Sequence, residues 1–198
     1  MKSKVLLSFL AVAAAALLPT FATCQVAPDR VPKEPTGPNY KYDVFAGYGY
    51  TSLNQVNQSR SGLQGVTASV TRNFGEHFGL SVDGGHYAWA VTSANTGNPT
   101  VDLFLAGPSF HAPLYDKISG FAHVLLGGAH TGNVSISPSV SFAGGAGIGM
   151  EYQMSPHFAL RAYGDDIASS FTLSPYQSGY STHMSWNARA GFGVAYKF

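Results

Sequence analysis

Charged residues are scarce in this 198-residue sequence, where Asp, Glu, Lys and Arg together make up only 11%. An ordinary soluble domain carries about 25%, so the shortage argues against a conventional soluble surface. The formal net charge of +1 excludes the strongly basic surface of a nucleic-acid-binding protein. A single cysteine, Cys24, excludes an internal disulfide framework. Aromatic residues, at 13%, are too frequent for a disordered chain.

Long apolar runs are also missing, apart from one near the N-terminus. Lys2 and Lys4 precede the apolar stretch Val5–Leu18, and small residues follow it. This order is typical of a secretory signal peptide, which we assign to residues 1–24. A transmembrane anchor is the alternative, but the stretch is shorter than the roughly 20 residues that a spanning helix needs, and Pro19 ends it.

The cleavage site has two candidates, Thr20-Phe21-Ala22 and Ala22-Thr23-Cys24. Phe21–Cys24 also weakly resembles a lipoprotein box, which would make Cys24 a lipidation site. Phe and Thr fit the first and third positions of that box poorly, so the sequence favours an unlipidated chain. The residues that follow, 25–41, contain four prolines and almost no aliphatic side chains, which predicts an extended linker.

From residue 42 to residue 198 the sequence alternates with a period of two, and glycine is too frequent for helices. The pattern predicts one all-β domain of eight antiparallel strands at about 41–52, 63–74, 77–91, 100–112, 118–131, 139–153, 157–169 and 183–198. Short turns alternate with longer connections near 53–62, 92–99, 132–138 and 170–182. That alternation is typical of a transmembrane β-barrel with short periplasmic turns and longer outer loops.

Within the strands, one face carries aliphatic and aromatic side chains, and the other mixes charge with small residues. Lipid outside and a polar interior fit this division, whereas a soluble barrel would reverse it. We expect Leu103 and Ile148 to face lipid, because large apolar side chains on every strand would overfill an eight-stranded interior. The predicted interior polar network contains Asp43, Asp83, Asp102, His123, Glu151, Arg161, Asp165 and Arg189.

The third strand is out of phase. His86 falls on the lipid face unless a β-bulge at Gly84-Gly85 shifts the alternation, which would turn Tyr87 and Trp89 outward.

Aromatic residues at the strand ends predict two girdles. The periplasmic girdle would contain Tyr42, Phe74, Phe78, Tyr152, Phe158, Tyr196 and Phe198, and Tyr50, Trp89, Phe171 and Trp186 would lie near the outer interface.

The C-terminal residues 191–198 resemble the barrel-assembly signal of bacterial outer-membrane proteins. The shared features are alternating apolar residues, Phe192, Val194 and Tyr196, an aromatic residue third from the end, and a terminal Phe198. More broadly, residues 42–198 resemble the small outer-membrane β-barrels of the OmpA and OmpX type, with Val44–Tyr50 similar to their first strand. The resemblance implies an outer-membrane location, contact with outer-membrane lipid, and handling by the barrel-assembly machinery.

No specific activity is assignable from the residues. The inward charges suit either a proton or ion path or a paired polar core, and the cost of unpaired buried charge favours pairing Arg161 and Arg189 with carboxylates. His183-Met184-Ser185 resembles the His-x-Ser element of outer-membrane lipid A deacylases, but no acidic residue follows Ser185. The histidines are scattered, which speaks against a metal site.

We therefore expect a non-enzymatic barrel with a structural or surface-interaction role, without catalytic residues, cofactor or metal. Its extracellular ligand is unknown. The alternatives are a lipid-modifying enzyme and a narrow pore. The larger OmpA architecture adds a peptidoglycan-binding domain, and we do not expect that anchoring role here.

Overall fold

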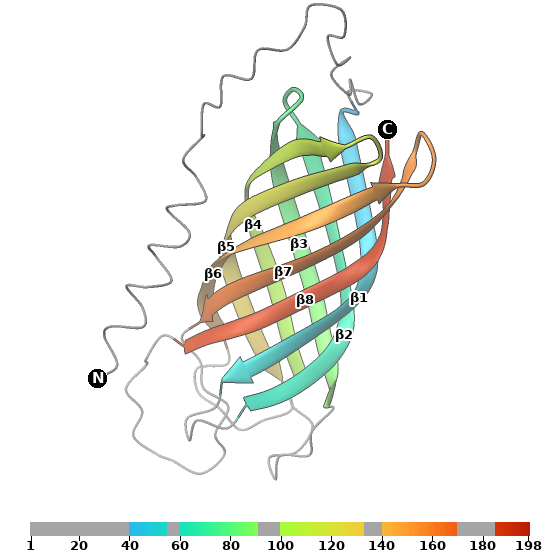
Figure 1. Cartoon of the computed structure of the whole chain (residues 1–198). Coiled ribbons are helices and arrows are strands. Elements are labelled where there is room, and N and C mark those ends of the chain that lie inside the picture. The colour runs from blue at the N-terminus through green and yellow to red at the C-terminus, as the bar shows by residue number, and fades with distance from the viewer. Residues whose placement is uncertain (1–39, 55–59, 91–99, 133–139, 170–184) are drawn as a thin grey trace, which may run out of the picture. The chain divides into compact units, whose positions relative to one another are not determined.

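Eight antiparallel strands close into a barrel in the computed structural model (Figure 1). The structure describes residues 40–54, 60–90, 100–132, 140–169 and 185–198. The strands are β1 (Tyr42–Asn54), β2 (Arg60–Asn73), β3 (Phe78–Ala90), β4 (Thr100–Tyr115), β5 (Ile118–Gly132), β6 (Val140–Gln153), β7 (Phe158–Ser169) and β8 (Ser185–Lys197). The predicted fold class is confirmed, and each strand begins and ends within three residues of its expected bounds.

The three short connections lie at one end of the barrel. In the β2–β3 turn, Gly75 has a φ of 142°, a conformation that favours glycine. The Phe74 amide donates to the Phe78 carbonyl at 2.8 Å, and the Met154 amide donates to the Phe158 carbonyl at 2.9 Å. The backbones of Tyr42 and Phe198 are hydrogen-bonded to each other at this same short-turn end. The predicted signal peptide, most of the linker and most of the longer connections lie outside the described residues.

The strands are strongly staggered around the barrel. A path that starts at His130 and steps to the paired residue on each neighbouring strand passes through Asp102 and His86 and returns to β5 at Gly120. It therefore comes back ten residues from its start. Such a shear requires strands that tilt by about 35–45° from the barrel axis. The ribbons in Figure 1 are slanted accordingly.

The outer surface of the barrel is apolar. Exposed large side chains alternate with inward ones along each strand, and they include Val66, Val82, Phe104, Val124, Leu126, Ile148, Met150, Phe192 and Val194. Aromatic residues are exposed at the short-turn end, namely Phe74, Phe78, Tyr152, Phe158, Tyr196 and Phe198, and Tyr50 and Trp186 are exposed towards the opposite end. No helix in the described part of the chain is long and apolar enough to cross a membrane.

The expected orientation of β4 is wrong. Leu103 is only 7% exposed and lies inside the barrel with Val101 and Leu105, whereas Phe104, 65% exposed, lies on the outer face. Asp102 therefore points outward and does not belong to the interior network. The physical reason is that the interior is apolar at the end opposite the short turns, so apolar and polar residues exchange faces there.

The irregularity of β3 lies further along than the sequence suggested. Gln64 pairs with Trp89 and Gly65 pairs with Tyr87, so Ala88 is the extra residue of a β-bulge. Gly84-Gly85 pairs without interruption, and β3 keeps its phase through Tyr87. His86 is therefore exposed on the outer face, and Tyr87 is fully buried inside the barrel.

Arginine substitutions should destabilise the barrel on both faces, for different reasons. Ile148 is 71% exposed on the outer surface, so Ile148→Arg should cost about 2–4 kcal/mol in a lipid bilayer if this site lies near the midplane. Leu103→Arg should also destabilise, because it places an unpaired charge inside the barrel. Urea unfolding in lipid vesicles measures both costs.

Spin labels at the same positions show the direction of each side chain. A label at 148 should be reached by lipid-soluble oxygen, and a label at 103 should be shielded from it. Equal oxygen accessibility at 103 and 148 would contradict the inward position of Leu103.

Candidate functional site

A first group of buried charges fills the barrel near the short-turn end, and we call it the Arg161 cluster: Asp43, Glu151, Arg161 and Lys197. The Arg161 guanidinium donates through Nε to Glu151 Oε1 at 2.6 Å and pairs with Asp43 Oδ2 at 2.5 Å. Lys197 pairs with the second oxygen of Glu151. The two cations match the two carboxylates, so the cluster is neutral without a bound ion.

Aromatic rings hold Arg161 in place. Its guanidinium carbon lies 5.3 Å from the centroid of the Phe45 ring and 5.2 Å from that of the Phe121 ring. Both contacts are within the range of a cation–π interaction. Phe121 fits because its cross-strand partner is Gly149, where a Cβ atom would collide with the ring.

A second group lies further into the barrel, and we call it the Arg189 cluster: Asp83, His123, Asp165 and Arg189. Arg189 donates through Nε to Asp165 Oδ2 at 2.7 Å and also pairs with Asp83. His123 Nε2 lies 2.9 Å from Asp165 Oδ1. The Arg189 guanidinium packs over the Tyr163 ring at 5.2 Å, and the Tyr163 hydroxyl hydrogen-bonds Thr67 at 2.8 Å.

The end of the barrel interior opposite the short turns is closed by side chains without charge, which we call the apolar layer. Its members are Leu53, Leu63, Tyr87, Val101, Leu103, Leu105, Leu125, Ala129, Ala143 and Ile167. All of them are at most 7% exposed. The interior therefore changes along its axis from paired charges to a packed hydrophobic core.

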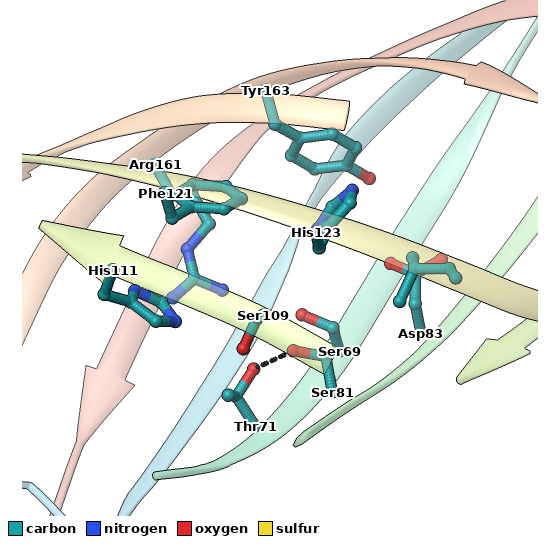
Figure 2. Close-up of a pocket in the computed structure, with 11 residues that line it drawn as sticks. Ser69, Thr71, Ser81, Asp83, Ser109, His111, Phe121, His123, Arg161 and Tyr163 are labelled. Carbon is teal, nitrogen blue, oxygen red and sulfur yellow. Dashed lines mark hydrogen bonds between the residues drawn. The ribbon is translucent and has the colours of Figure 1, made fainter. Parts of the chain in front are cut away.

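A small polar cavity lies between the two charge clusters. Its volume is about 20 Å³, and Figure 2 shows hydroxyl groups and two histidine rings around it. Arg161 and Asp83 lie in its wall, but their charges are already paired. The cavity is far too small for a substrate, since ligand pockets usually measure about 300–1,000 Å³.

On the outer face, Asp102 lies between two histidines from neighbouring strands. His86 Nδ1 is 2.5 Å from Asp102 Oδ1, and His130 Nδ1 is 3.4 Å from Asp102 Oδ2. All three side chains are about half exposed, at 51%, 48% and 50% for His86, Asp102 and His130. They directly follow the outward row of Gly84, Phe104 and Gly128, where the apolar part of this face ends.

The structure thus brings together seven of the eight residues predicted for the interior network, in the two clusters above, and places Asp102 elsewhere. Sequence reasoning did not single out Phe45, Phe121 and Tyr163, which pack against the arginines. Their parity was a usable signal, because each shares a strand face with a predicted inward charge. The assembly-signal residues Phe192, Val194, Tyr196 and Phe198 all point outward.

The two candidates for a chemical site are a metal site and the His-x-Ser element. No group of three or more His, Cys, Asp or Glu side chains in the described ranges could hold a metal ion. His183 of the His-x-Ser element lies outside the described residues, and β8 begins at Ser185.

No protein-family profile matches the sequence, and no curated protein matches it. Solved structures match its fold. Neisserial surface protein A has a TM-score of 0.60 and 15% identity, covering 80% of this chain and 97% of that one. The N-terminal β-barrel domain of Pseudomonas aeruginosa OprF has a TM-score of 0.52 and 14% identity, covering 80% and 98%.

The attachment invasion locus protein Ail of Yersinia pestis gives a TM-score of 0.51 and 14% identity, covering 80% of this chain and 99% of that one. At these identities the likeness shows the fold alone. The apolar outer surface described above is the one with which such a barrel contacts lipid.

Asparagine substitutions should cost more stability at the interior carboxylates than at Asp102. Asp165→Asn removes a buried charge that pairs with Arg189 and contacts His123, and breaking a buried pair costs about 3–5 kcal/mol. Asp102→Asn should cost less than about 1 kcal/mol, because that carboxylate is half exposed. Urea unfolding in vesicles compares the two variants, and equal losses would contradict the assignment.

Proposed function

We propose that this chain, which has the fold of the small eight-stranded outer-membrane β-barrels, is a closed scaffold that acts at the cell surface through its longer connections. The observation that supports this proposal is the filled interior. The two clusters of paired charges and the apolar layer fill the described part of the interior, and the polar cavity between the clusters measures about 20 Å³, which speaks against a conducting path or a substrate pocket.

The remaining candidates for function are the residues at the end opposite the short turns. The segments 55–59, 91–99, 133–139 and 170–184 join the strand ends there and lie outside the described residues. Two proteins with this fold carry names that refer to the surface or to attachment. These names are compatible with a role in surface interaction. For this chain the proposal rests on the filled interior.

We further propose that the chain reaches this position through the signal peptide 1–24 and the C-terminal assembly signal. Phe198 lies where the barrel closes, since its amide donates to the Tyr42 carbonyl at 2.9 Å and its carbonyl accepts from the Tyr42 amide at 2.8 Å. Tyr196 packs against Phe158 with ring centroids 5.0 Å apart.

Whole cells expressing the full chain test the surface role. Binding to immobilised matrix proteins, polysaccharides and cultured cells should exceed that of cells with empty vector. Each of the segments 55–59, 91–99, 133–139 and 170–184 is replaced in turn by a short Gly-Ser turn, and at least one replacement should remove the binding while the barrel still shows heat-dependent mobility on gels. Binding that survives all four replacements, or no binding to any of the surfaces, would contradict the proposal.

Conductance in planar bilayers tests the closed interior. The wild-type barrel should give no stepwise current, because the apolar layer excludes water and ions. Replacing Leu105 and Leu125 together by Ser should produce measurable current, since both lie in that layer. Val124→Ser, on the outer face next to Leu125, is the matched control and should stay silent. Wild-type conductance would favour the pore alternative.

Deletion of Phe198 should reduce assembled barrel several-fold, because the deletion removes both the terminal aromatic residue and two hydrogen bonds of the closure. Phe78→Ala is the control, since Phe78 is also an exposed aromatic residue at the same end but is not in the assembly signal. The heat-modifiable fraction in outer-membrane preparations is the measurement. Equal yields for both variants would argue against a special role of the C-terminus.

A further inference from the structure

Two buried polar atoms on β4 have no partner within the described structure. They are Ser109 Oγ and His111 Nε2. Ser109 and His111 are two residues apart on one strand, so both side chains point into the barrel. A buried polar atom that stays unpaired costs about 1–3 kcal/mol, and native structures rarely contain such atoms without a water or ion nearby.

Packing against Phe121 holds the His111 ring in place. The His111 ring stacks on Phe121, its cross-strand neighbour, with centroids 5.8 Å apart and planes 28° apart. Ser109 lies beside His123, its cross-strand partner on β5. Ser109 and His111 both line the same space, the polar cavity between the Arg161 and Arg189 clusters (Figure 2).

The size and walls of this cavity define what it can hold. Its volume of about 20 Å³ is sufficient for one water molecule, which needs about 10–15 Å³ and two to four polar partners. Beside Ser109 and His111 the wall contains Ser69, Ser81 and Thr71. Thr71 and Ser81 share one hydrogen bond of 2.8 Å, and each hydroxyl can still take part in another.

The charges in the wall do not require an ion in the cavity. Asp83 is paired with Arg189, and Arg161 is paired with Asp43 and Glu151. The hydroxyl groups and histidine rings around the cavity suit a neutral molecule that both donates and accepts hydrogen bonds.

We propose that the cavity is a binding site for a single ordered water molecule, which bridges Ser109 Oγ and His111 Nε2 and bonds to the Thr71–Ser81 hydroxyl pair. The water completes the hydrogen bonding of β4 and connects the polar groups between the two charge clusters. This site is independent of any surface partner of the barrel.

A double-mutant cycle tests the water bridge through the direction in which each substitution changes the unfolding equilibrium constant. If water joins the two residues, Ser109→Ala and His111→Phe should each raise the unfolding equilibrium constant about 2- to 10-fold in vesicles. The combined variant should lose less than the product of the two effects, because the second change removes a bridge that is already broken. His111→Phe keeps the ring that stacks on Phe121, so packing is largely preserved.

If the cavity is dry, both atoms are unpaired in the wild type, and each substitution should lower the unfolding constant, with effects that multiply. That result would overturn the proposal.

The wild-type chain supplies a second measurement, which does not depend on whether the variants fold. In detergent micelles, NMR cross-relaxation from water to the His111 ring protons should have the sign of a water molecule bound for longer than nanoseconds. Ser109→Val, which fills the space, should abolish the signal. A wild-type spectrum without this cross-relaxation would contradict the bound water.

Discussion

Closure of the hydrogen-bonded sheet is the constraint on which the rest of this structure depends. A strand in lipid has no water to satisfy its amides and carbonyls, so an open edge is not viable there. The edge is removed by pairing Asp43–Ser52 of β1 with residues 188–197 of β8, and the Tyr42–Phe198 pair completes the ladder at the short-turn end. Closure then fixes both the stagger of the strands and the narrow interior.

The narrow interior explains why large side chains and glycines occur in pairs. Tyr163 lies opposite Gly191, as Phe121 lies opposite Gly149, and in each case a Cβ on the glycine would collide with the ring. The aromatic faces in turn support the arginines, whose charges are paired with carboxylates from other strands. Ion pairs, rings and glycines thus form one packed unit, so a change to any of them alters the surroundings of the others.

Much of this fold could be predicted from the sequence because alternation is a local property. On β6, β7 and β8 the parity of Glu151, Arg161 and Arg189 gave the correct inward face. On β4 the same rule failed, because the apolar layer reverses the polarity of the interior that the rule assumes. The His86–Asp102–His130 group could not be predicted either, since its members come from three strands and meet only through the register. Cross-strand pairs such as Tyr163 and Gly191 could not be predicted from the sequence for the same reason.

The apolar layer gives the barrel an electrical asymmetry. A voltage across a membrane falls most steeply where the dielectric constant is lowest, which here is the hydrophobic half of the interior. The buried arginines and carboxylates lie outside that region, nearer the short-turn end. An ion crossing the barrel would therefore meet its largest energy barrier in the apolar layer and not among the paired charges.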